Sequence, residues 1–272
     1  MAICGLTGNP VTLPGFCSDA PQRFACRGFR HANPFEIHFI IHNVMKKDRK
    51  TLAIFDLDNT LLNGDSDYLW GRFLVQNKLV DGDYYERENH RYYEEYKAGH
   101  LDIFEFLGFA LKPLTEHAVA DLEQLRARFL EEKIQPIITD AARALLQDHR
   151  RRGHYLLIIT ATNRFVTEPI AALLGVDDLL ATDPEMRDGR YTGRVAGTPC
   201  FREGKVTRLT EWLRATGRNL ENAWFYSDSH NDLPLLELVS NPVAVNPDDT
   251  LAQHAAVKQW PIIRLADPSP SS

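Results

Sequence analysis

Short apolar runs alternate along the chain with longer segments in which apolar residues recur at helical spacing. The apolar runs are TLAIF (51–55), HYLLIIT (154–160), DDLLAT (177–182), NAWFYS (222–227) and NPVAVN (241–246). Runs of this length are typical of strands that are covered on both faces. Because helical segments separate them, the pattern predicts an α/β fold in which a Rossmann-like parallel sheet is the middle of three layers.

The stretch 65–138 interrupts this alternation, because helical spacing continues through it without a strand-like run. We therefore predict an all-helical cap at 65–138, inserted into an α/β core formed by 45–64 and 139–272. Within the core, RDGRYTGRV (187–195) has a D-G turn between strand-like arms, which predicts a β-hairpin.

Five tyrosines recur near helical spacing in the predicted cap segment DYYERENHRYYEEYKAGH. They are Tyr84, Tyr85, Tyr92, Tyr93 and Tyr96. Aromatic residues in this pattern favour a seam between packed helices, and a ligand-binding surface is the alternative.

Residues 1–44 differ from the rest of the chain, because proline and glycine interrupt them repeatedly and little regular period is present. Met45 then opens MKKDRKTLAIFDLD, a short basic leader that runs into the first predicted strand. We expect 1–44 to be either a disordered extension or a segment that is not translated, with Met45 as the natural start.

Composition argues against several classes of function. The 272 residues carry a net charge of −6, and 44% are hydrophobic, which is enough for one large core with an insertion. No stripe of Lys and Arg suits a phosphate backbone, so no nucleic-acid partner is predicted. No apolar stretch reaches the about 18 residues that cross a membrane, and no secretory signal is apparent. We expect a cytoplasmic protein without a membrane partner.

Polar residues gather where several predicted strands end. Asp56 and Asp58 follow the first strand, Thr160-Ala-Thr-Asn163 closes the second, and Asp228-Ser-His-Asn-Asp232 follows NAWFYS. In an open parallel sheet, ligands bind at the carboxyl ends of the strands. Lys205, which opens a later helix, is expected at the same edge.

The nearby aspartates at this edge require an explanation. Carboxylates that share a buried site repel one another, and burial favours their neutral forms. A divalent cation removes the conflict, and Mg²⁺ takes hard oxygen ligands while leaving room for a substrate phosphate. Asp56 and Asp58 at the end of a buried strand therefore predict Mg²⁺ and a phosphoryl group between the acidic side chains.

Four motifs resemble those of a known family. D-L-D-N-T (56–60), the strand-ending Thr160, Lys205 and D-S-H-N-D (228–232) match the motifs of the haloacid dehalogenase-like superfamily in order and spacing. Within it, the chain most resembles the phosphoserine phosphatase-like branch, some of whose members are assigned as histidinol-phosphatases. The resemblance implies a phosphoric monoester hydrolase acting on a small phosphomonoester.

The resemblance also implies catalytic roles. Asp56 would be the nucleophile that forms an aspartyl-phosphate. Asp58 would be the general acid for the leaving alkoxide and then the base for the attacking water. Thr160 would hydrogen-bond the phosphoryl oxygens, and Lys205 would neutralise charge that grows in the transition state.

Mg²⁺ is the cofactor that the resemblance implies. The Asp56 carboxylate, the Asp58 backbone carbonyl and Asp228 would hold the ion, with Asp232 as an additional ligand or as a partner of the ligands. Asn231 would orient either the phosphate or the motif lysine.

One feature shared with phosphoserine phosphatases and three departures from them bear on the substrate. Asp65 lies nine positions after Asp56, where those enzymes carry an acidic residue that binds the substrate amine. The cap stretch AGHLDIFEFLGFAL has no Arg to receive a substrate carboxylate. Thr-Ala-Thr replaces Ser-Gly-Gly in the second motif, with Thr162 as a substrate-binding candidate, and Ser229 replaces a usual Gly. An amine-bearing phosphomonoester without a carboxylate fits best, and histidinol phosphate is the leading candidate.

Three cap phenylalanines, Phe104, Phe106 and Phe109, are either part of the cap core, which is favoured, or a surface for an imidazole. Two alternatives to the main interpretation stay open. One is a phosphoserine phosphatase, and the other is a non-catalytic phosphoacceptor switch that uses Asp56. Asp58 and the large cap favour the enzyme, since a stable switch needs neither a general acid nor a lid. The sequence does not indicate an oligomeric state.

Overall fold

The computed structural model describes residues 50–265, and the structural statements below refer to that part of the chain. Its larger sheet has the strand order β3-β2-β1-β6-β7-β8, and every neighbouring pair is parallel. The strands are β1 (Leu52–Phe55), β2 (Tyr155–Asn163), β3 (Asp178–Thr182), β6 (Trp224–Ser227), β7 (Asn241–Val245) and β8 (Ile262–Ile263). The predicted α/β fold class is confirmed. The prediction for 1–44 lies outside the described residues.

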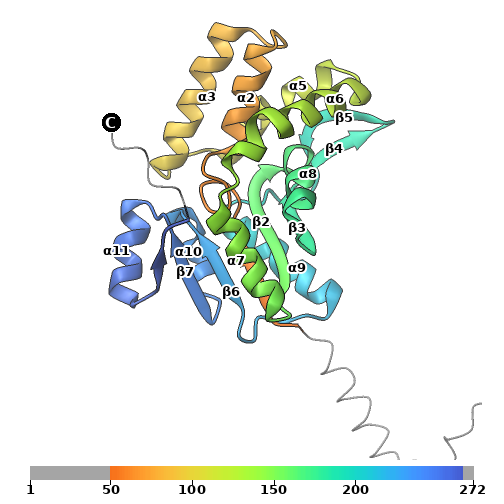
Figure 1. The fold of residues 1–272 in the computed structure, drawn as a ribbon. Coiled ribbons are helices and arrows are strands. Elements are labelled where there is room, and N and C mark those ends of the chain that lie inside the picture. The colour runs from red at the N-terminus through yellow and green to blue at the C-terminus, as the bar shows by residue number, and fades with distance from the viewer. Residues whose placement is uncertain (1–49, 266–272) are drawn as a thin grey trace, which may run out of the picture. The chain divides into compact units, whose positions relative to one another are not determined.

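The sheet is buried on both faces because its strands are apolar on both. Along β1, Ala53 and Phe55 join one hydrophobic core, whereas Leu52 and Ile54 join the core on the opposite face. The first core is covered by α7 (Asp140–Arg151) and α8 (Arg164–Leu174). The second is covered by α9 (Glu203–Thr216), α10 (Leu233–Leu236) and α11 (Asp249–Lys258). The sheet is therefore the middle of three layers (Figure 1).

The strand order reverses at the pair β1 and β6. From β1 the chain adds β2 and β3 on one side, and it then returns to add β6, β7 and β8 on the other. Phe55 lies beside Tyr226 in this pair, and the Asp56 backbone N–H donates to the Tyr226 carbonyl oxygen at 2.9 Å. Asp56 and Asp228 thus follow adjacent strands at the position where ligands gather in such sheets.

Helices and their connecting turns occupy the chain from Ser66 to Ile137, between β1 and β2. The helices are α2 (Ser66–Gln76), α3 (Gly82–Lys97), α4 (Ile103–Ala110), α5 (Lys112–Glu116) and α6 (Val119–Phe129), followed by a π turn (Leu130–Ile134) and a 3₁₀ turn (Gln135–Ile137). An aspartate side chain caps the first backbone N–H groups of α2, α3 and α4. In Figure 1, α2 and α3 stand beyond one end of the sheet strands.

The hairpin predicted at 187–195 is present. Strands β4 (Pro184–Arg187) and β5 (Arg190–Val195) pair antiparallel, and both turn residues between them have positive φ. β5 packs against α4 and α5, so the hairpin lies beside the helices that separate β1 from β2. The pattern did not predict β8, because two residues are too short a run to stand out. Within the described range, no helix is long and apolar enough to cross a membrane.

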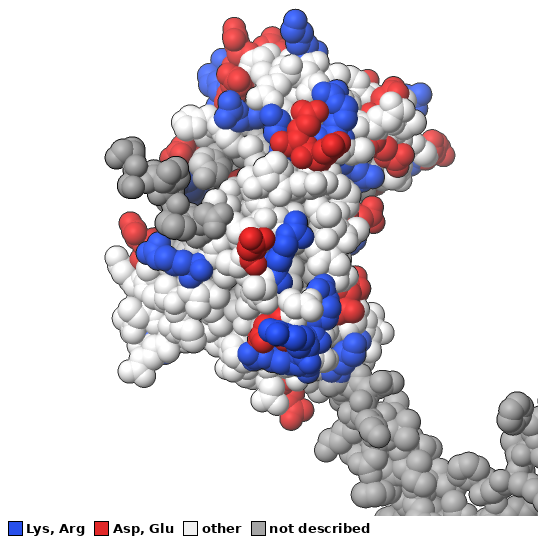
Figure 2. All heavy atoms as spheres, viewed as in Figure 1, with Lys and Arg blue, Asp and Glu red and all other residues white. Residues whose placement is uncertain are grey.

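Basic side chains gather over the C-terminal end of α7 in the view of Figure 2. The last turn of this helix carries Arg150 and Arg151, and Arg151 and Arg152 both pair with Asp148. Cations at this end complement the partial negative charge of the helix terminus. Helix chemistry therefore accounts for this basic group.

Candidate active site

A buried lysine joins two carboxylates at the carboxyl edge of the sheet. Lys205 reaches from α9, and its Nζ donates to Asp56 Oδ1 at 2.8 Å and to Asp232 Oδ2 at 2.7 Å. Ser227 Oγ donates to the same Asp232 oxygen at 2.7 Å. Lys205, Asp56 and Asp232 are each 5% exposed or less. Because buried charges are stable only when they are paired and hydrogen-bonded, these three side chains hold one another in place.

A second pair of carboxylates meets at one hydroxyl group. Thr60 Oγ1 lies 3.2 Å from Asp56 Oδ2 and 3.3 Å from Asp228 Oδ1, and it accepts from the Asp228 backbone N–H at 3.1 Å. The hydroxyl has one proton, so it can donate to only one of the two carboxylates at a time. Burial raises the pKa of Asp56 to about 7, although Lys205 opposes the shift. Burial and the neighbouring Asp56 raise the pKa of Asp228 as well.

Asp58 is turned away from this group toward the helices. Its Oδ1 accepts from the Ser66 backbone N–H at 2.6 Å, and its Oδ2 accepts from Thr162 Oγ1 at 2.8 Å. Burial, and then the charge of Asp65, raise its pKa to about 7. Two carboxylates only two residues apart therefore have different partners, since Asp56 contacts the lysine and Asp58 contacts Thr162 and the start of α2.

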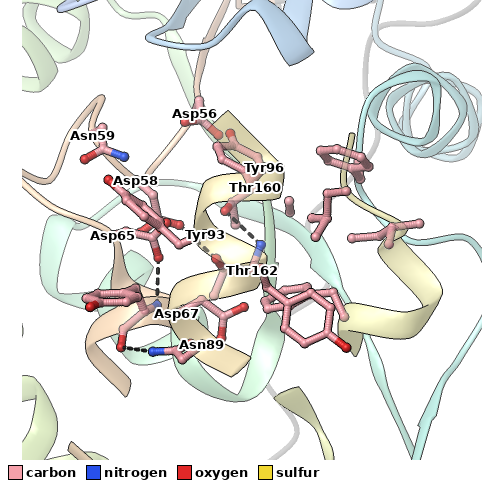
Figure 3. A pocket seen from close by; sticks show the side chains of 17 residues that line it. Asp56, Asp58, Asn59, Asp65, Asp67, Asn89, Tyr93, Tyr96, Thr160 and Thr162 are labelled. Carbon is pink, nitrogen blue, oxygen red and sulfur yellow. Dashed lines mark hydrogen bonds between the residues drawn. The ribbon is translucent and has the colours of Figure 1, made fainter. Parts of the chain in front are cut away.

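A pocket opens between these residues and the helices, with a cavity volume of about 60 Å³. Figure 3 shows the side chains that surround it, which come from the strand ends, from α2, α3 and α4, and from neighbouring loops. The polar lining residues are Asp56, Asp58, Asn59, Asp65, Asp67, Asn89, Thr160 and Thr162, and the aromatic ones are Tyr68, Tyr92, Tyr93, Tyr96, Phe106 and Phe201. Several polar groups on a largely aromatic lining are typical of a site for a small molecule.

The two threonines of the second motif differ in what they contact. Thr160 is buried, lines the pocket, and its Oγ1 accepts from the Thr162 backbone N–H at 3.2 Å. Thr162 donates its hydroxyl proton to Asp58, so it fixes the orientation of that carboxylate. Both threonines thus line the pocket, and the catalytic role of Thr160 and the substrate-binding role of Thr162 stay predictions.

Asp65 is at once a helix cap and a pocket residue. Its Oδ1 accepts from the Tyr68 backbone N–H at 2.8 Å, which caps α2, and its side chain lines the pocket. Burial raises its pKa above the ordinary value. A nearby ammonium group would favour the charged form of this carboxylate. The role of Asp65 in binding a substrate amine stays a prediction.

The aromatic residues divide between the pocket and the helix seam. Tyr92, Tyr93 and Tyr96 line the pocket, so a seam alone does not describe them. Tyr85 packs on Phe109 with ring centroids 4.3 Å apart, as the seam prediction expects. Among the three cap phenylalanines, Phe106 lines the pocket, Phe109 packs among tyrosines, and Phe104 is 68% exposed.

Most of the chain matches a known protein family. The family model described as haloacid dehalogenase-like hydrolase matches residues 53–237, which include all four motifs. The chain belongs to the haloacid dehalogenase-like hydrolases. The predicted family is confirmed, as is the prediction that the chain is an enzyme, a phosphoric monoester hydrolase.

Individual relatives agree with this family. A histidinol-phosphatase of Neisseria meningitidis serogroup C (strain 8013) is 46% identical over 220 residues, covering 79% of this chain and 99% of the relative. A Bordetella pertussis Tohama I structure of unknown function is 44% identical, with a TM-score of 0.76 over 79% of this chain and 99% of that one. A substrate-bound phosphoserine phosphatase is 21% identical, with a TM-score of 0.60 over 80% and 93%, and it shows the shared fold.

Asn231 makes hydrogen bonds that its sequence motif did not indicate. Its Oδ1 accepts from Arg202 Nε at 2.9 Å, and its Nδ2 donates to the Tyr96 carbonyl oxygen at 3.2 Å. Arg202 also donates to the carbonyl oxygen of Gly99, just after α3. These bonds join the strand-end loops to the end of α3. Sequence reasoning missed Arg202, since neither a motif nor a period marks it.

The carboxylates at the strand ends can be compared with the ligands that Mg²⁺ prefers. Among the described residues, no group of three or more His, Cys, Asp or Glu side chains is arranged to hold a metal ion. Asp56 and Asp228 both contact the Thr60 hydroxyl, whereas Asp232 does not and is bound by Lys205 and Ser227. Mg²⁺ needs only one or two protein carboxylates when phosphate and water complete its shell. The pair therefore fits the ion, and a direct role for Asp232 stays a prediction.

Proposed function

We propose that the hydrolase is a Mg²⁺-dependent phosphatase that cleaves a small amine-bearing phosphomonoester through an aspartyl-phosphate intermediate. Histidinol phosphate is the leading candidate substrate. The observation that carries the proposal is that Asp56 and Asp58 have different hydrogen-bonding partners. Lys205 holds Asp56 at the end of β1, while Thr162 holds Asp58 beside the pocket. A nucleophile and a general acid need these two different environments.

The first step transfers the phosphoryl group to the protein. A carboxylate oxygen of Asp56 attacks phosphorus, and the bond from phosphorus to the substrate oxygen breaks as the new bond forms. Asp58 gives its proton to the leaving oxygen. Its pKa of about 7 keeps that proton available near neutral pH, where an ordinary aspartate has already lost it.

The second step returns the protein to its starting state. The Asp58 carboxylate takes a proton from a water molecule, and the water oxygen attacks phosphorus. The bond between phosphorus and Asp56 breaks, which releases inorganic phosphate and restores the carboxylate. Asp58 is then protonated for the next cycle.

Positive charge supports both steps. Lys205 stays protonated, because Asp232 and Asp56 raise its pKa, and it offsets negative charge on the nucleophile and the phosphoryl group. Asp232 and Ser227 fix the position of its ammonium group. Mg²⁺, held by Asp56, Asp228 and the Asp58 carbonyl oxygen, would supply further positive charge at the phosphate. Thr160, which lines the pocket, would hydrogen-bond a phosphoryl oxygen.

The charges of the pocket support the choice of an amine. Among the described lining residues are four aspartates and no Lys, Arg or His. A substrate carboxylate would meet repulsion there, whereas Asp65 offers a partner to an ammonium group. We therefore favour a substrate without a carboxylate over phosphoserine, in agreement with the name of the N. meningitidis relative.

The helices between β1 and β2 would act as the cap that closes over the substrate. They supply Asp65, Asp67 and the tyrosines of the pocket, and the bonds of Arg202 and Asn231 hold the end of α3 on the strand-end loops. Closure excludes water other than the one that reacts.

A phosphate-release assay with and without Mg²⁺ tests the proposal. Wild-type protein is expected to hydrolyse histidinol phosphate and p-nitrophenyl phosphate with many turnovers per chain, and chelation of the metal should abolish the reaction. Preference for phosphoserine would support the phosphoserine phosphatase alternative. Release of one phosphate per chain or less would support the phosphoacceptor switch.

A further inference from the structure

Asp67 is a pocket carboxylate to which neither the motifs nor the mechanism assigns a role. It lies in the first turn of α2 and lines the pocket together with Asn89 and Tyr92. No described residue donates a hydrogen bond to its carboxylate or pairs with it as a cation. Burial, followed by the charges of Asp65 and Asp58, raises its pKa well above the ordinary value. Asp67 therefore occupies a place where a charged carboxylate is unfavourable without a ligand.

Helix formation does not explain this carboxylate. An acidic residue in a first turn interacts favourably with the helix terminus. Asp83 does this in α3, two residues after a capping aspartate, as Asp67 is two residues after the capping Asp65. Asp83 is exposed, so it gains the same interaction without losing water. Asp67 is instead half-buried at the pocket, a placement that the helix does not require.

The surroundings of Asp67 indicate the kind of group that it would bind. Aromatic rings of Tyr92, Tyr93, Phe106 and Phe201 form much of the pocket wall, and flat rings or cations pack well on such faces. In the proposed function, Asp56 and Asp58 serve the phosphate, and Asp65 serves one amine. A substrate with a single amine would leave Asp67 without a partner.

We propose that Asp67 is a specificity-determining residue that binds a second nitrogen group of the substrate, carried on a flat ring that packs against the aromatic wall. The substrate is then a phosphomonoester with a primary amine and a nitrogen-containing aromatic ring that donates an N–H bond. This inference rests on the proposed function, because it concerns the same pocket and the same reaction.

Two substrates with the same amine and phosphate isolate the contribution of the ring nitrogen. Histidinol phosphate carries an imidazole, and phenylalaninol phosphate carries a phenyl ring of similar size that cannot hydrogen-bond. The ratio of kcat/KM for the two substrates should be measured in wild-type protein, in Asp67→Asn and in the matched control Asp83→Asn. Wild-type and control are expected to favour histidinol phosphate by about 10- to 100-fold, as for one charge-assisted hydrogen bond, and Asp67→Asn should lower this ratio at least about 10-fold.

The outcomes separate the two proposals. If wild-type protein hydrolyses no phosphomonoester, p-nitrophenyl phosphate included, the proposed function fails. If it hydrolyses both ring substrates equally well, or if Asp67→Asn keeps the wild-type ratio, the role of Asp67 is overturned while the phosphatase stands. The wild-type comparison requires no variant, so poor folding of Asp67→Asn would not leave the proposal untested.

Discussion

The side chains at the strand ends (the floor of the site) and those on the helical side of the pocket (the wall) differ in how their carboxylates are partnered. On the floor, Lys205 and Ser227 bind Asp232, and Lys205 and Thr60 contact Asp56. On the wall, Asp67 has no cationic or hydrogen-bonding partner among the described residues, and it lines the pocket together with several aromatic residues. The protein thus supplies partners for Asp56 and Asp232 on the floor. A partner for Asp67 on the wall would have to come from a ligand.

This difference matches the chemistry expected of each region. Groups that make and break bonds must keep a fixed orientation, and fixed partners reduce the reorganisation that a reaction requires. A polar group that selects a substrate discriminates best when only the right substrate can pair with it, because a wrong ligand leaves the group without a hydrogen bond. Changes to the floor should therefore alter the rate for every substrate, and changes to the wall should alter the choice among substrates.

Asp56→Asn should have the largest effect on the floor. The amide is a poor nucleophile, so kcat is expected to fall by at least about 10⁴-fold for p-nitrophenyl phosphate and for histidinol phosphate alike. Phosphate release in steady state measures this loss, with the melting temperature as a control for folding. A variant that retains a tenth of the wild-type rate would show that Asp56 is not the nucleophile.

Asp58→Asn should have a smaller effect that depends on the leaving group. Loss of the general acid is expected to lower kcat by at least about 10² for an alkyl phosphomonoester such as histidinol phosphate. The loss should be smaller for p-nitrophenyl phosphate, because its leaving oxygen needs less protonation. Full activity with the alkyl substrate would remove the role assigned to Asp58.

The stability of the metal-free protein should fall as pH rises. Asp56 and Asp58 release protons near 3.8 when the chain is unfolded but only near 7 in the folded state. Between these values the unfolded chain binds fewer protons, so the free energy of unfolding decreases with rising pH. Lys205 stays charged over this pH range, because Asp232 and Asp56 raise its pKa above the ordinary value of a lysine.

Mg²⁺ should reverse part of that loss. At a concentration one hundred times its Kd, the ion is expected to add about 2.7 kcal/mol at pH 8. Thermal melts across pH 4–8, with Mg²⁺ and with a chelator, measure both effects. A metal-free protein that is as stable at pH 8 as at pH 5 would contradict the burial of these carboxylates.

Thr162→Val should have the smallest effect of the floor variants. It removes the hydrogen bond to Asp58 Oδ2 but leaves the one from the Ser66 backbone, so we expect kcat to fall by about 10-fold. A change in KM without a change in kcat would instead place Thr162 in direct contact with the substrate. Comparing kcat and KM for the two ring substrates distinguishes these results.

Much of the floor was predictable from sequence, because its residues belong to short motifs at strand ends. Strand periodicity places Asp56 and Asp228 at one edge, and sheet topology brings them together. The motifs did not indicate how the side chains divide their contacts. That Asp58 faces Thr162 follows from packing between segments over one hundred residues apart, which no local pattern records.

The wall was less predictable for a physical reason. A tyrosine at helical spacing has the same pattern whether it faces a neighbouring helix or a cavity, so Tyr85 and Tyr92 could not be separated by periodicity. Asp67 and Asp83 likewise both read as helix-terminal acids, although only Asp67 lines the pocket. Arg202 joins the two regions through bonds to Asn231 and the backbone, and its sequence context gives no sign of them.

Acid quenching during turnover tests most directly whether Asp56 forms an aspartyl-phosphate. Wild-type protein is mixed with histidinol phosphate and Mg²⁺, denatured in acid within one turnover, and digested for mass spectrometry. One phosphoryl group per chain is expected on the peptide that contains Asp56, and none when Mg²⁺ is removed or in Asp56→Asn. Continued phosphate release with a phosphoryl group on a different residue, or with none on the protein, would contradict it.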